Sequence, residues 1–281
     1  MSGNCCDVTG QAFDAKDAAR DIREYRRFGP AGQTAELLRS VRDLELVDVT
    51  LLDIGGGVGV IHHELLDDIA REATHVDASA AYLEVARQES ARRGHGPRIR
   101  FIHADFTEIA SELPQADVVT LDRVVCCYPD FRLLLRSAAD RSRRILAMTY
   151  PRQTWYLRMG LDIVNFFQRL RRDPFRVFLH PVQEMERLLN HEGLRRVSVK
   201  RQFVWEVALY SRSSRHWARE RWGALPPLVS RRAAPRKRRR APGLRPRAEG
   251  ISAGPDTRRA SPPAHASGAA RFSSGRYCAR W

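Results

Sequence analysis

The stretch that decides the fold is VTLLDIGGGVGV, residues 49–60, in which an apolar run ends in an acid followed by four glycines. Glycine-rich loops bring the backbone close to nucleotides, and three such patterns compete here. A phosphate-binding loop needs Gly-Lys-Ser/Thr, and this stretch contains no lysine. A dinucleotide-binding loop needs a small residue where Val60 stands. The third pattern, acid-x-G-x-G-x-G, is met by Asp53, Gly55, Gly57 and Gly59.

The sequence around this stretch alternates between strand and helix patterns. Short, nearly all-apolar strands that alternate with helices are typical of a parallel sheet covered on both faces. We expect two helices within residues 14–44, strands at 48–54, 74–78, 98–104, 116–122 and 143–150, helices at 58–72, 80–93, 106–113, 130–141 and 153–171, another in VQEMERLLNHEG, and a closing hairpin at 197–200 and 203–211. The predicted fold class is α/β, with a seven-stranded, mostly parallel sheet and an antiparallel C-terminal hairpin.

The net charge of +15 is confined to one end of the chain. The 70 residues after Ser211 hold 18 basic and 3 acidic residues, whereas the first 211 hold 30 of each. This last segment is rich in Arg, Pro, Ala, Gly and Ser, which cannot bury enough apolar surface to offset chain entropy. We therefore predict a helical N-terminal cap at 1–44, one folded domain at 45–211 and a basic, disordered tail at 212–281. The tail's RKRRR run could bind nucleic acid or an anionic membrane, or be only a solvated extension.

The five cysteines form two adjacent pairs, Cys5-Cys6 and Cys126-Cys127, with Cys278 left over. This is not the spacing of a disulfide framework. We find no signal-peptide pattern and no long uncharged apolar run, so a soluble, cytoplasmic protein is expected. The two pairs could supply four thiols if the N-terminal segment folded over the domain. Adjacent cysteines diverge and chelate poorly, so we predict no metal.

Histidine patterns also fail to indicate a metal site. His63-Glu64 begins the zinc-protease pattern H-E-x-x-H, but its last position holds Asp67. His62 shares a helix face with apolar residues, so we expect a packed or cofactor-adjacent side chain. His75 and His103 lie in or beside strands and are expected to be core or strand-end residues.

The glycine pattern resembles motif I of the class I, Rossmann-like S-adenosylmethionine (SAM)-dependent methyltransferases, over roughly residues 45–211. SAM carries no phosphate, so its loop needs bare backbone rather than a lysine. The resemblance implies that Asp77 binds the ribose hydroxyls, that Asp105 contacts the adenine amino group, and that Phe106 stacks on the ring. The full set of cofactor-binding residues that it implies is Asp53, Gly55, Gly56, Gly57, Gly59, Asp77, Ala78, Asp105, Phe106 and Asp122.

In this family the loop after the fourth strand faces the methyl acceptor. Here the loop reads LDRVVCCYPD, residues 121–130, and lacks the Asn/Asp-Pro-Pro-Tyr/Phe motif of enzymes that methylate amino groups of bases or glutamines. The sequence looks more like the small-molecule branch, such as the methyltransferases of quinone and porphyrin biosynthesis. Methyl transfer to oxygen benefits from a base, and the candidate catalytic residues are His180, Tyr128, Asp122 and Cys127.

The predicted function is methyl transfer from SAM to oxygen or carbon of a small molecule by in-line displacement. Alternatives are an RNA-modifying methyltransferase that uses the basic tail, an NAD-dependent oxidoreductase, a non-catalytic nucleotide-binding protein, and glycines that merely tighten a turn. The sequence does not indicate the acceptor or the oligomeric state.

Overall fold

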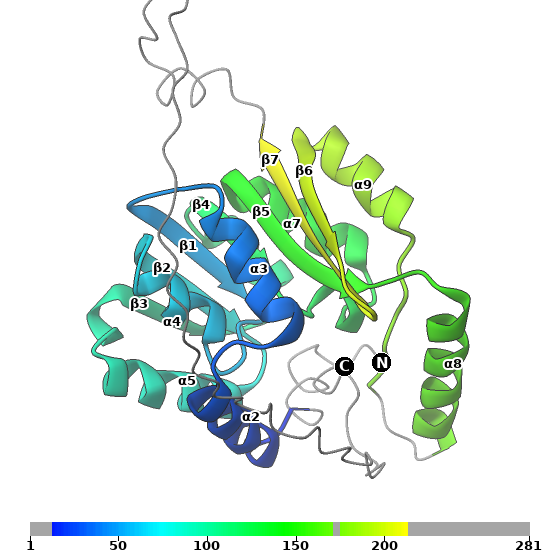
Figure 1. Cartoon of the computed structure of the whole chain (residues 1–281), viewed down its shortest axis with the longest axis horizontal. Helices are drawn as coiled ribbons and strands as arrows, with labels where there is room; N and C mark the ends of the chain where they lie inside the picture. The colour runs from blue at the N-terminus through cyan, green and yellow to red at the C-terminus, as the bar shows by residue number, and fades with distance from the viewer. Residues whose placement is uncertain (1–12, 171–174, 213–281) are drawn as a thin grey trace, which may run out of the picture. The chain divides into compact units, whose positions relative to one another are not determined.

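A computed structural model describes residues 13–170 and 175–212 of the chain, and its centre is a seven-stranded sheet (Figure 1). The strand order is β3-β2-β1-β4-β5-β7-β6. The first five strands are parallel to one another, whereas β7 is antiparallel to both β5 and β6. The strands are β1 (Val49–Ile54), β2 (Ala70–Asp77), β3 (Ile99–His103), β4 (Ala116–Leu121), β5 (Ser142–Pro151), β6 (Leu194–Arg201) and β7 (Trp205–Arg212). The predicted fold class is confirmed.

Helices and short 3-10 turns connect the strands. They are α2 (Ala15–Phe28), α3 (Gly32–Arg42), α4 (Val60–Leu66), α5 (Ala80–Arg93), η1 (Gly96–Arg98), α6 (Phe106–Ile109), η2 (Ala110–Glu112), η3 (Val125–Cys127), α7 (Phe131–Arg141), α8 (Trp155–Leu170) and α9 (Val182–His191). Strands β2 and β3 are added on one side of β1, whereas β4 is added on its other side, so the order of the strands switches between β1 and β4. In open α/β sheets a ligand crevice forms at the carboxyl ends of the strands at such a point.

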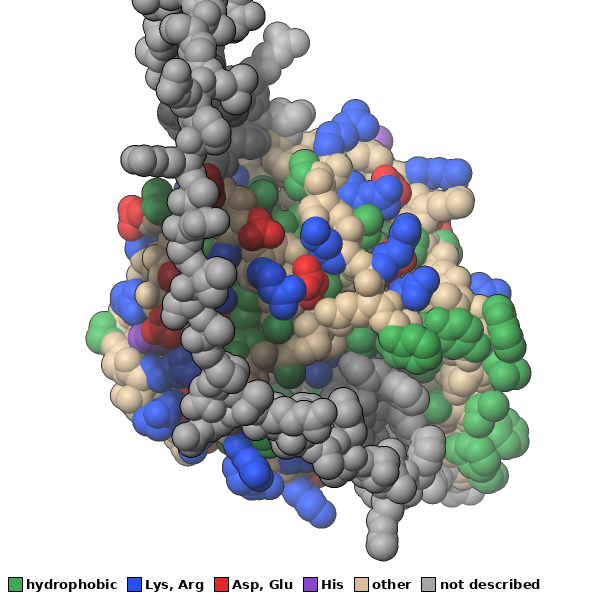
Figure 2. Space-filling view, in the orientation of Figure 1, with side chains coloured by type: hydrophobic (Ala, Val, Ile, Leu, Met, Phe, Trp, Pro, Cys, Tyr) green, Lys and Arg blue, Asp and Glu red, His purple; other side chains and the backbone are tan. Residues whose placement is uncertain are grey.

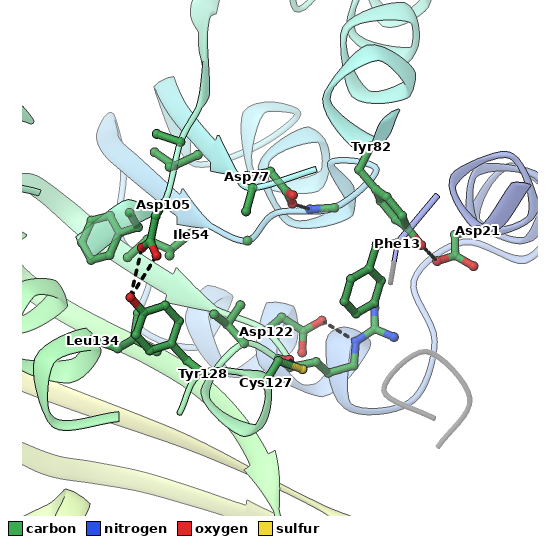
Figure 3. A pocket seen from close by; sticks show the side chains of 18 residues that line it. Phe13, Asp21, Ile54, Asp77, Tyr82, Asp105, Asp122, Cys127, Tyr128 and Leu134 are labelled. Carbon is green, nitrogen blue, oxygen red and sulfur yellow. Dashed lines mark hydrogen bonds and ion pairs between the residues drawn. The ribbon is translucent and has the colours of Figure 1, made fainter. Parts of the chain in front are cut away.

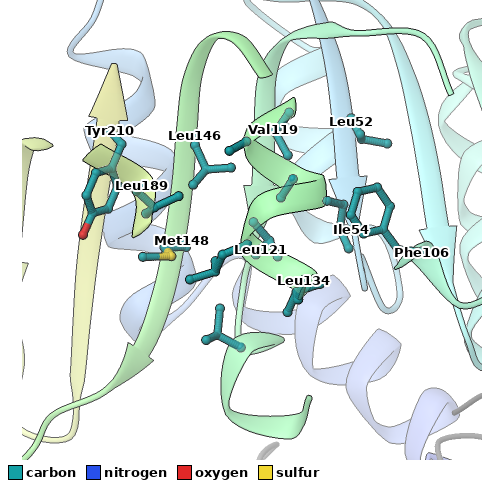
Figure 4. Packing of buried hydrophobic residues seen from close by; sticks show 14 of the residues in the cluster. Leu52, Ile54, Phe106, Val119, Leu121, Leu134, Leu146, Met148, Leu189 and Tyr210 are labelled. Carbon is teal, nitrogen blue, oxygen red and sulfur yellow. The ribbon is translucent and has the colours of Figure 1, made fainter. Parts of the chain in front are cut away.

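Two apolar layers bury the two faces of the sheet. One layer packs α7 and α9 against the sheet through Leu121, Leu134, Leu146 and Leu189, all at most 1% exposed (Figure 4). The other layer holds α3 and α4 against the opposite face. Both faces are therefore covered, as the continuous apolar character of the strands predicts.

The region after the glycine loop differs from its predicted boundaries. A helix was expected over residues 58–72 and a strand over 74–78, whereas α4 ends at Leu66 and β2 begins at Ala70. The parallel pairing of Val49 with Ala70 and of Thr50 with Glu72 extends β2 toward its start. Strand pairing therefore overrides the helical pattern that the sequence continues through Ala70-Arg71-Glu72.

The two N-terminal helices have different contacts. Helix α3 places Leu37, Leu38 and Val41 in the apolar layer beneath the sheet. Helix α2 packs instead on α5, beside the glycine loop, where Ala18 and Ile22 meet Val58. The segment predicted as a cap thus contributes one helix to the core and one to the rim of the ligand crevice.

Helix α8 carries an exposed apolar face. Its exposed large side chains are Trp155, Met159, Ile163, Phe166, Phe167 and Leu170. Figure 2 shows these side chains as an apolar patch at the right of the view, where α8 lies in Figure 1. Among the described residues, no helix has the length and apolar character needed to span a bilayer. The predicted disordered tail lies outside the described residues, apart from Arg212 at the end of β7.

Candidate functional site

A cavity lies at the carboxyl ends of β1, β2, β3 and β4 (Figure 3). It has a volume of about 150 Å³. Nine of the residues predicted from the sequence line it: Gly55, Gly57, Asp77, Ala78, Asp105, Phe106, Asp122, Cys127 and Tyr128. Four separate strand-end loops contribute these residues, so the parallel sheet brings them together.

The glycine loop presents backbone to this cavity. Gly55 and Gly57 have φ values of +61° and +59°, which side chains other than glycine rarely adopt. A Cβ added at Gly55 would lie 2.6 Å from Cγ2 of Val124. Glycine at this position therefore keeps β1 close to the loop after β4 and leaves the cavity wall flat.

Asp77 ends β2 and is fixed by backbone donors. The amide of Gly57 donates to Oδ2 at 2.9 Å and the amide of Ser79 donates to Oδ1 at 2.8 Å. Burial raises the pKa of Asp77 to about 6, against the effect of these hydrogen bonds. A buried carboxylate with acceptor capacity at a cavity wall suits hydroxyl donors such as a ribose diol.

Asp105 and Tyr128 form a hydrogen-bonded pair across the cavity. The Tyr128 hydroxyl lies 3.2 and 3.0 Å from the two carboxylate oxygens of Asp105, and 2.6 Å from Oγ1 of Thr107. Asp105 also caps α6, because its Oδ1 accepts from the Thr107 amide at 2.9 Å. Phe106 follows and is only 5% exposed. Asp105 and the rings of Phe106 and Tyr128 thus line the end of the cavity next to β3.

Asp122 follows β4 and is held by two threonines from distant elements. Thr34 Oγ1 donates to Oδ2 at 2.5 Å, and Thr149 Oγ1 donates to Oδ1 at 2.6 Å. Arg123 lies beside it, with its Nε 3.6 Å from Oδ2. The carboxylate is therefore fixed in orientation at the wall of the cavity.

Residues 51–146 match a protein family described as a methyltransferase domain. Within these residues the chain carries a methyltransferase domain. S-adenosylmethionine is the cofactor of such domains, and the side-chain-free loop with a buried carboxylate opposite it fits a nucleoside without phosphate. The resemblance that the glycine motif predicted is confirmed.

Solved structures of methyltransferases share the fold. Magnesium protoporphyrin IX methyltransferase from Synechocystis, crystallised with S-adenosylhomocysteine (SAH), is 16% identical with a TM-score of 0.56, and the alignment covers 74% of this chain and 99% of that one. An O-methyltransferase family protein from Burkholderia thailandensis is 17% identical with a TM-score of 0.54, over 72% of this chain and 64% of that one. No curated protein matches the sequence.

Three of the predicted cofactor-binding residues, Asp53, Gly56 and Gly59, belong to or adjoin a cluster of buried polar side chains on the far side of the glycine loop from the cavity. Asp53 points away from the cavity, since its Oδ1 accepts from Thr120 Oγ1 at 2.7 Å and its Oδ2 lies 3.2 Å from Nδ1 of His62. A Cβ added at Gly56 would lie 2.5 Å from Asp53 Oδ2, and one added at Gly59 would lie 2.5 Å from Cε1 of His62. The glycine loop therefore separates the cavity from a cluster of buried polar side chains.

His180, a predicted catalytic residue, packs behind the wall of the cavity. Its Nε2 lies 2.9 Å from the carbonyl oxygen of Tyr128, and its ring stacks against Phe131 and Phe178. Burial lowers the pKa of His180, so the ring is neutral at pH 7 and Nε2 donates to that carbonyl. The contact positions the loop that carries Tyr128.

The cysteine pair after β4 lies at the rim of an apolar cluster. Cys126 is buried with Phe175, Val177 and Trp205, whereas Cys127 is half-buried and lines the cavity. Their sulfur atoms are 3.7 Å apart. The possible meeting of this pair with Cys5-Cys6 involves residues outside the described part of the chain.

The sequence did not indicate three residues that line the cavity. Phe13 packs edge-on against Tyr82 and Phe175, and the Tyr82 hydroxyl donates to Asp21 at 2.7 Å. Asp21 and Phe13 belong to the N-terminal segment, and Tyr82 to α5. None of the three belongs to a motif, and the packing of α2 on α5 brings them to the cavity.

Proposed function

We propose that the protein transfers the methyl group of S-adenosylmethionine to an oxygen or carbon of a small-molecule acceptor. The observation that carries this proposal is the cavity in which bare backbone at Gly55 and Gly57 faces the carboxylates of Asp77 and Asp105. The side of the cavity formed by these residues suits the nucleoside of the cofactor. The opposite wall offers Asp122, Tyr128 and Cys127 to the methyl acceptor.

The cofactor-binding roles are assigned by donor and acceptor chemistry. We assign the ribose hydroxyls to Asp77, because both its oxygens are fixed by backbone amides and retain lone pairs. We assign the adenine to the space between Ala78, Asp105 and Phe106, where an acid can accept from an amino group beside an aromatic ring. The methionine part then extends along Gly55 toward Asp122.

SAM supplies a methyl group activated by its positive sulfur, so the protein's task is to align the acceptor with that carbon and to exclude water. Phe13 and Tyr82 close the cavity on the side of α2. Val124, Cys127 and Tyr128 form the wall after β4. These apolar and weakly polar walls favour an uncharged or aromatic acceptor.

For an acceptor with a hydroxyl, we assign the uptake of its proton to Asp122. Its carboxylate lines the cavity and is oriented by Thr34 and Thr149. We assign His180 a positioning role, because its Nε2 is engaged by the carbonyl of Tyr128.

The small-molecule class is supported by what surrounds the acceptor wall. The loop after β4 lacks the proline-rich amine-binding motif, and its neighbours are the apolar residues Phe175, Val177 and Trp205. A magnesium protoporphyrin IX methyltransferase shares the fold over 99% of its own length. A flat or extended aromatic acceptor is consistent with both observations.

Calorimetry with SAH and NAD tests the proposal. We expect SAH to bind with a Kd on the order of micromolar and NAD to give no heat of binding. Asp77→Ala should abolish SAH binding, whereas Asp140→Ala, on the exposed side of α7, should not change it. Binding of NAD, or undiminished SAH binding by the Asp77 variant, would refute the assignment.

A further inference from the structure

A cluster of buried polar side chains lies beneath the glycine loop, separate from the cavity. Asp53 comes from β1, His62 from α4 and His75 from β2, and each is at most 1% exposed. Asp53 and His75 are paired in register on neighbouring parallel strands. Helix α4 returns over these strands directly after the loop, so the fold brings all three side chains together.

Two of the three distances between these side chains are close to those between the ligands of a metal ion. His62 Nδ1 lies 3.2 Å from Asp53 Oδ2 and 3.1 Å from His75 Nδ1. One donor atom from each residue can be chosen so that all lie within 4.8 Å. Tetrahedral Zn²⁺ with bonds of about 2.0–2.1 Å places its ligand atoms about 3.3–3.4 Å apart. The two short contacts are close to that spacing.

Hydrogen bonding alone accounts poorly for this cluster. Nδ1 of His62 can carry only one hydrogen, yet it faces both Asp53 and His75. A cation between Oδ2 of Asp53 and the two Nδ1 atoms would resolve this conflict, because each of the three atoms would then direct a lone pair at the ion.

The surroundings favour neutral imidazoles and an oriented carboxylate. Both imidazoles are fully buried, and burial favours the neutral form, which has a free lone pair. Thr120 donates to Oδ1 of Asp53 at 2.7 Å and leaves Oδ2 directed at His62. Metal-binding carboxylates are commonly oriented by such a second hydrogen bond.

We propose that Asp53, His62 and His75 bind one divalent transition-metal ion, Zn²⁺ by the nitrogen and oxygen character of the donors. A water molecule would complete the coordination. The ion would tie β1, β2 and α4 together under the loop that faces the cavity. Its role is structural, because the three side chains point away from that cavity, and it does not depend on which methyl acceptor is used.

Metal analysis of the full chain without a polyhistidine tag tests the site. After growth with zinc we expect about one ion per chain in the wild type, and a fall of about tenfold in both His62→Ala and His75→Ala. The exposed histidine of α9 provides the matched control, and His191→Ala should keep the ion. Full metal content in both site variants would overturn the proposal.

Cobalt titration decides the case if the variants fail to fold. Metal-free wild-type chain should take up Co²⁺ with the visible absorption of a four-coordinate ion and without a sulfur-to-cobalt charge-transfer band, because the donors are nitrogen and oxygen. A thiolate band would place the ion at the cysteines instead. Either that band or the absence of Co²⁺ binding would overturn the proposal.

Discussion

At the scale of single residues, the glycines of the loop have two different neighbours. Gly55 and Gly57 face the cavity, whereas Gly56 and Gly59 make room for the side chains of Asp53 and His62. One short motif therefore serves a ligand on one side and a polar cluster on the other. A substitution at Gly55 or Gly57 should therefore affect ligand binding in the cavity, whereas one at Gly56 or Gly59 should affect the buried polar cluster.

Gly55→Ala should disturb the cavity side. Its φ of +61° and the 2.6 Å approach to Val124 predict a loss of about 1–3 kcal/mol in the free energy of unfolding. SAH affinity should fall with it, because the loop must move from the cavity wall. Urea denaturation and calorimetry measure both effects. Gly160→Ala in α8, where a Cβ meets nothing within 4 Å, is the control; it should keep SAH affinity and raise stability by about 0.5–1 kcal/mol, since Ala favours a helix interior over Gly.

Tyr128→Phe isolates the hydroxyl that joins Asp105 and Thr107. The ring remains in the cavity wall, so only the hydrogen bonds are removed. We expect a loss of about 1 kcal/mol in stability and a decrease of about tenfold or less in SAH affinity. Tyr156→Phe in the exposed helix α8 serves as the comparison. An SAH affinity equal to that of the wild type would separate Tyr128 from the nucleoside site.

At the scale of elements, the position of α2 over the cavity depends on its contact with α5. Glu89 of α5 is fully buried and binds Arg26 of α2, as well as Arg92 and Arg93 of its own helix. Hydrogen bonds from Arg92, followed by those from Arg93 and Arg26, outweigh burial and lower the pKa of Glu89 to about 2. An ion pair thus links the cavity rim to the sheet-covering helices.

Glu89→Gln should destabilise the fold by about 2 kcal/mol at pH 7, a value reduced by the partial exposure of the arginines. The folded-state pKa lies below the unfolded value, so the ionised group stabilises the fold above about pH 4.5. That stabilisation is lost as the pH falls toward 2. The stability difference between wild type and variant, measured by urea denaturation, should therefore shrink between pH 5 and 3.

Glu84→Gln is the matched control for this pair. Glu84 lies on the same helix and contacts only the exposed Gln88 among the hydrogen bonds of the described residues. Its substitution should change stability by less than about 0.5 kcal/mol at any of these pH values. A pH-independent difference for Glu89→Gln would argue against an ionised Glu89 in the folded state.

At the scale of the whole molecule, all seven described strands and the described residues that line the cavity precede residue 213. β7 inserts between β5 and β6 and ends at Arg212, whose side chain binds the carbonyls of Ala139, Ser142 and Glu192. The family match ends earlier, at residue 146. Apart from Arg212, the excess of basic residues lies after β7, beyond the described residues.

A chain truncated after residue 212 should keep SAH affinity within about threefold of the full chain, because all the described residues that line the cavity are retained. Methyl transfer to a small acceptor should also be retained. Calorimetry and an acceptor assay with both chains measure this. Loss of transfer on truncation, with SAH binding intact, would favour the RNA-modifying alternative, in which the basic tail captures the substrate.

The sequence by itself determined the sheet, the cofactor class and most of the cavity. Apolar strands and a glycine motif are local features, and parallel strands necessarily bring Asp77, Asp105 and Asp122 to one edge. It did not determine the length of α4, since the pairing of Ala70 with Val49 is a contact between distant segments.

Only the tertiary structure decided what the remaining polar residues do. His180 was expected at the chemistry, but its partner is a carbonyl 52 residues away. Phe13 and Asp21 reach the cavity only because α2 packs on α5. Asp53, His62 and His75 have no metal-binding spacing in the sequence, and they meet because the register of β1 and β2 and the return of α4 place them at one point. Spacing along the chain records neighbours within one element, whereas a site built from three elements depends on how they pack.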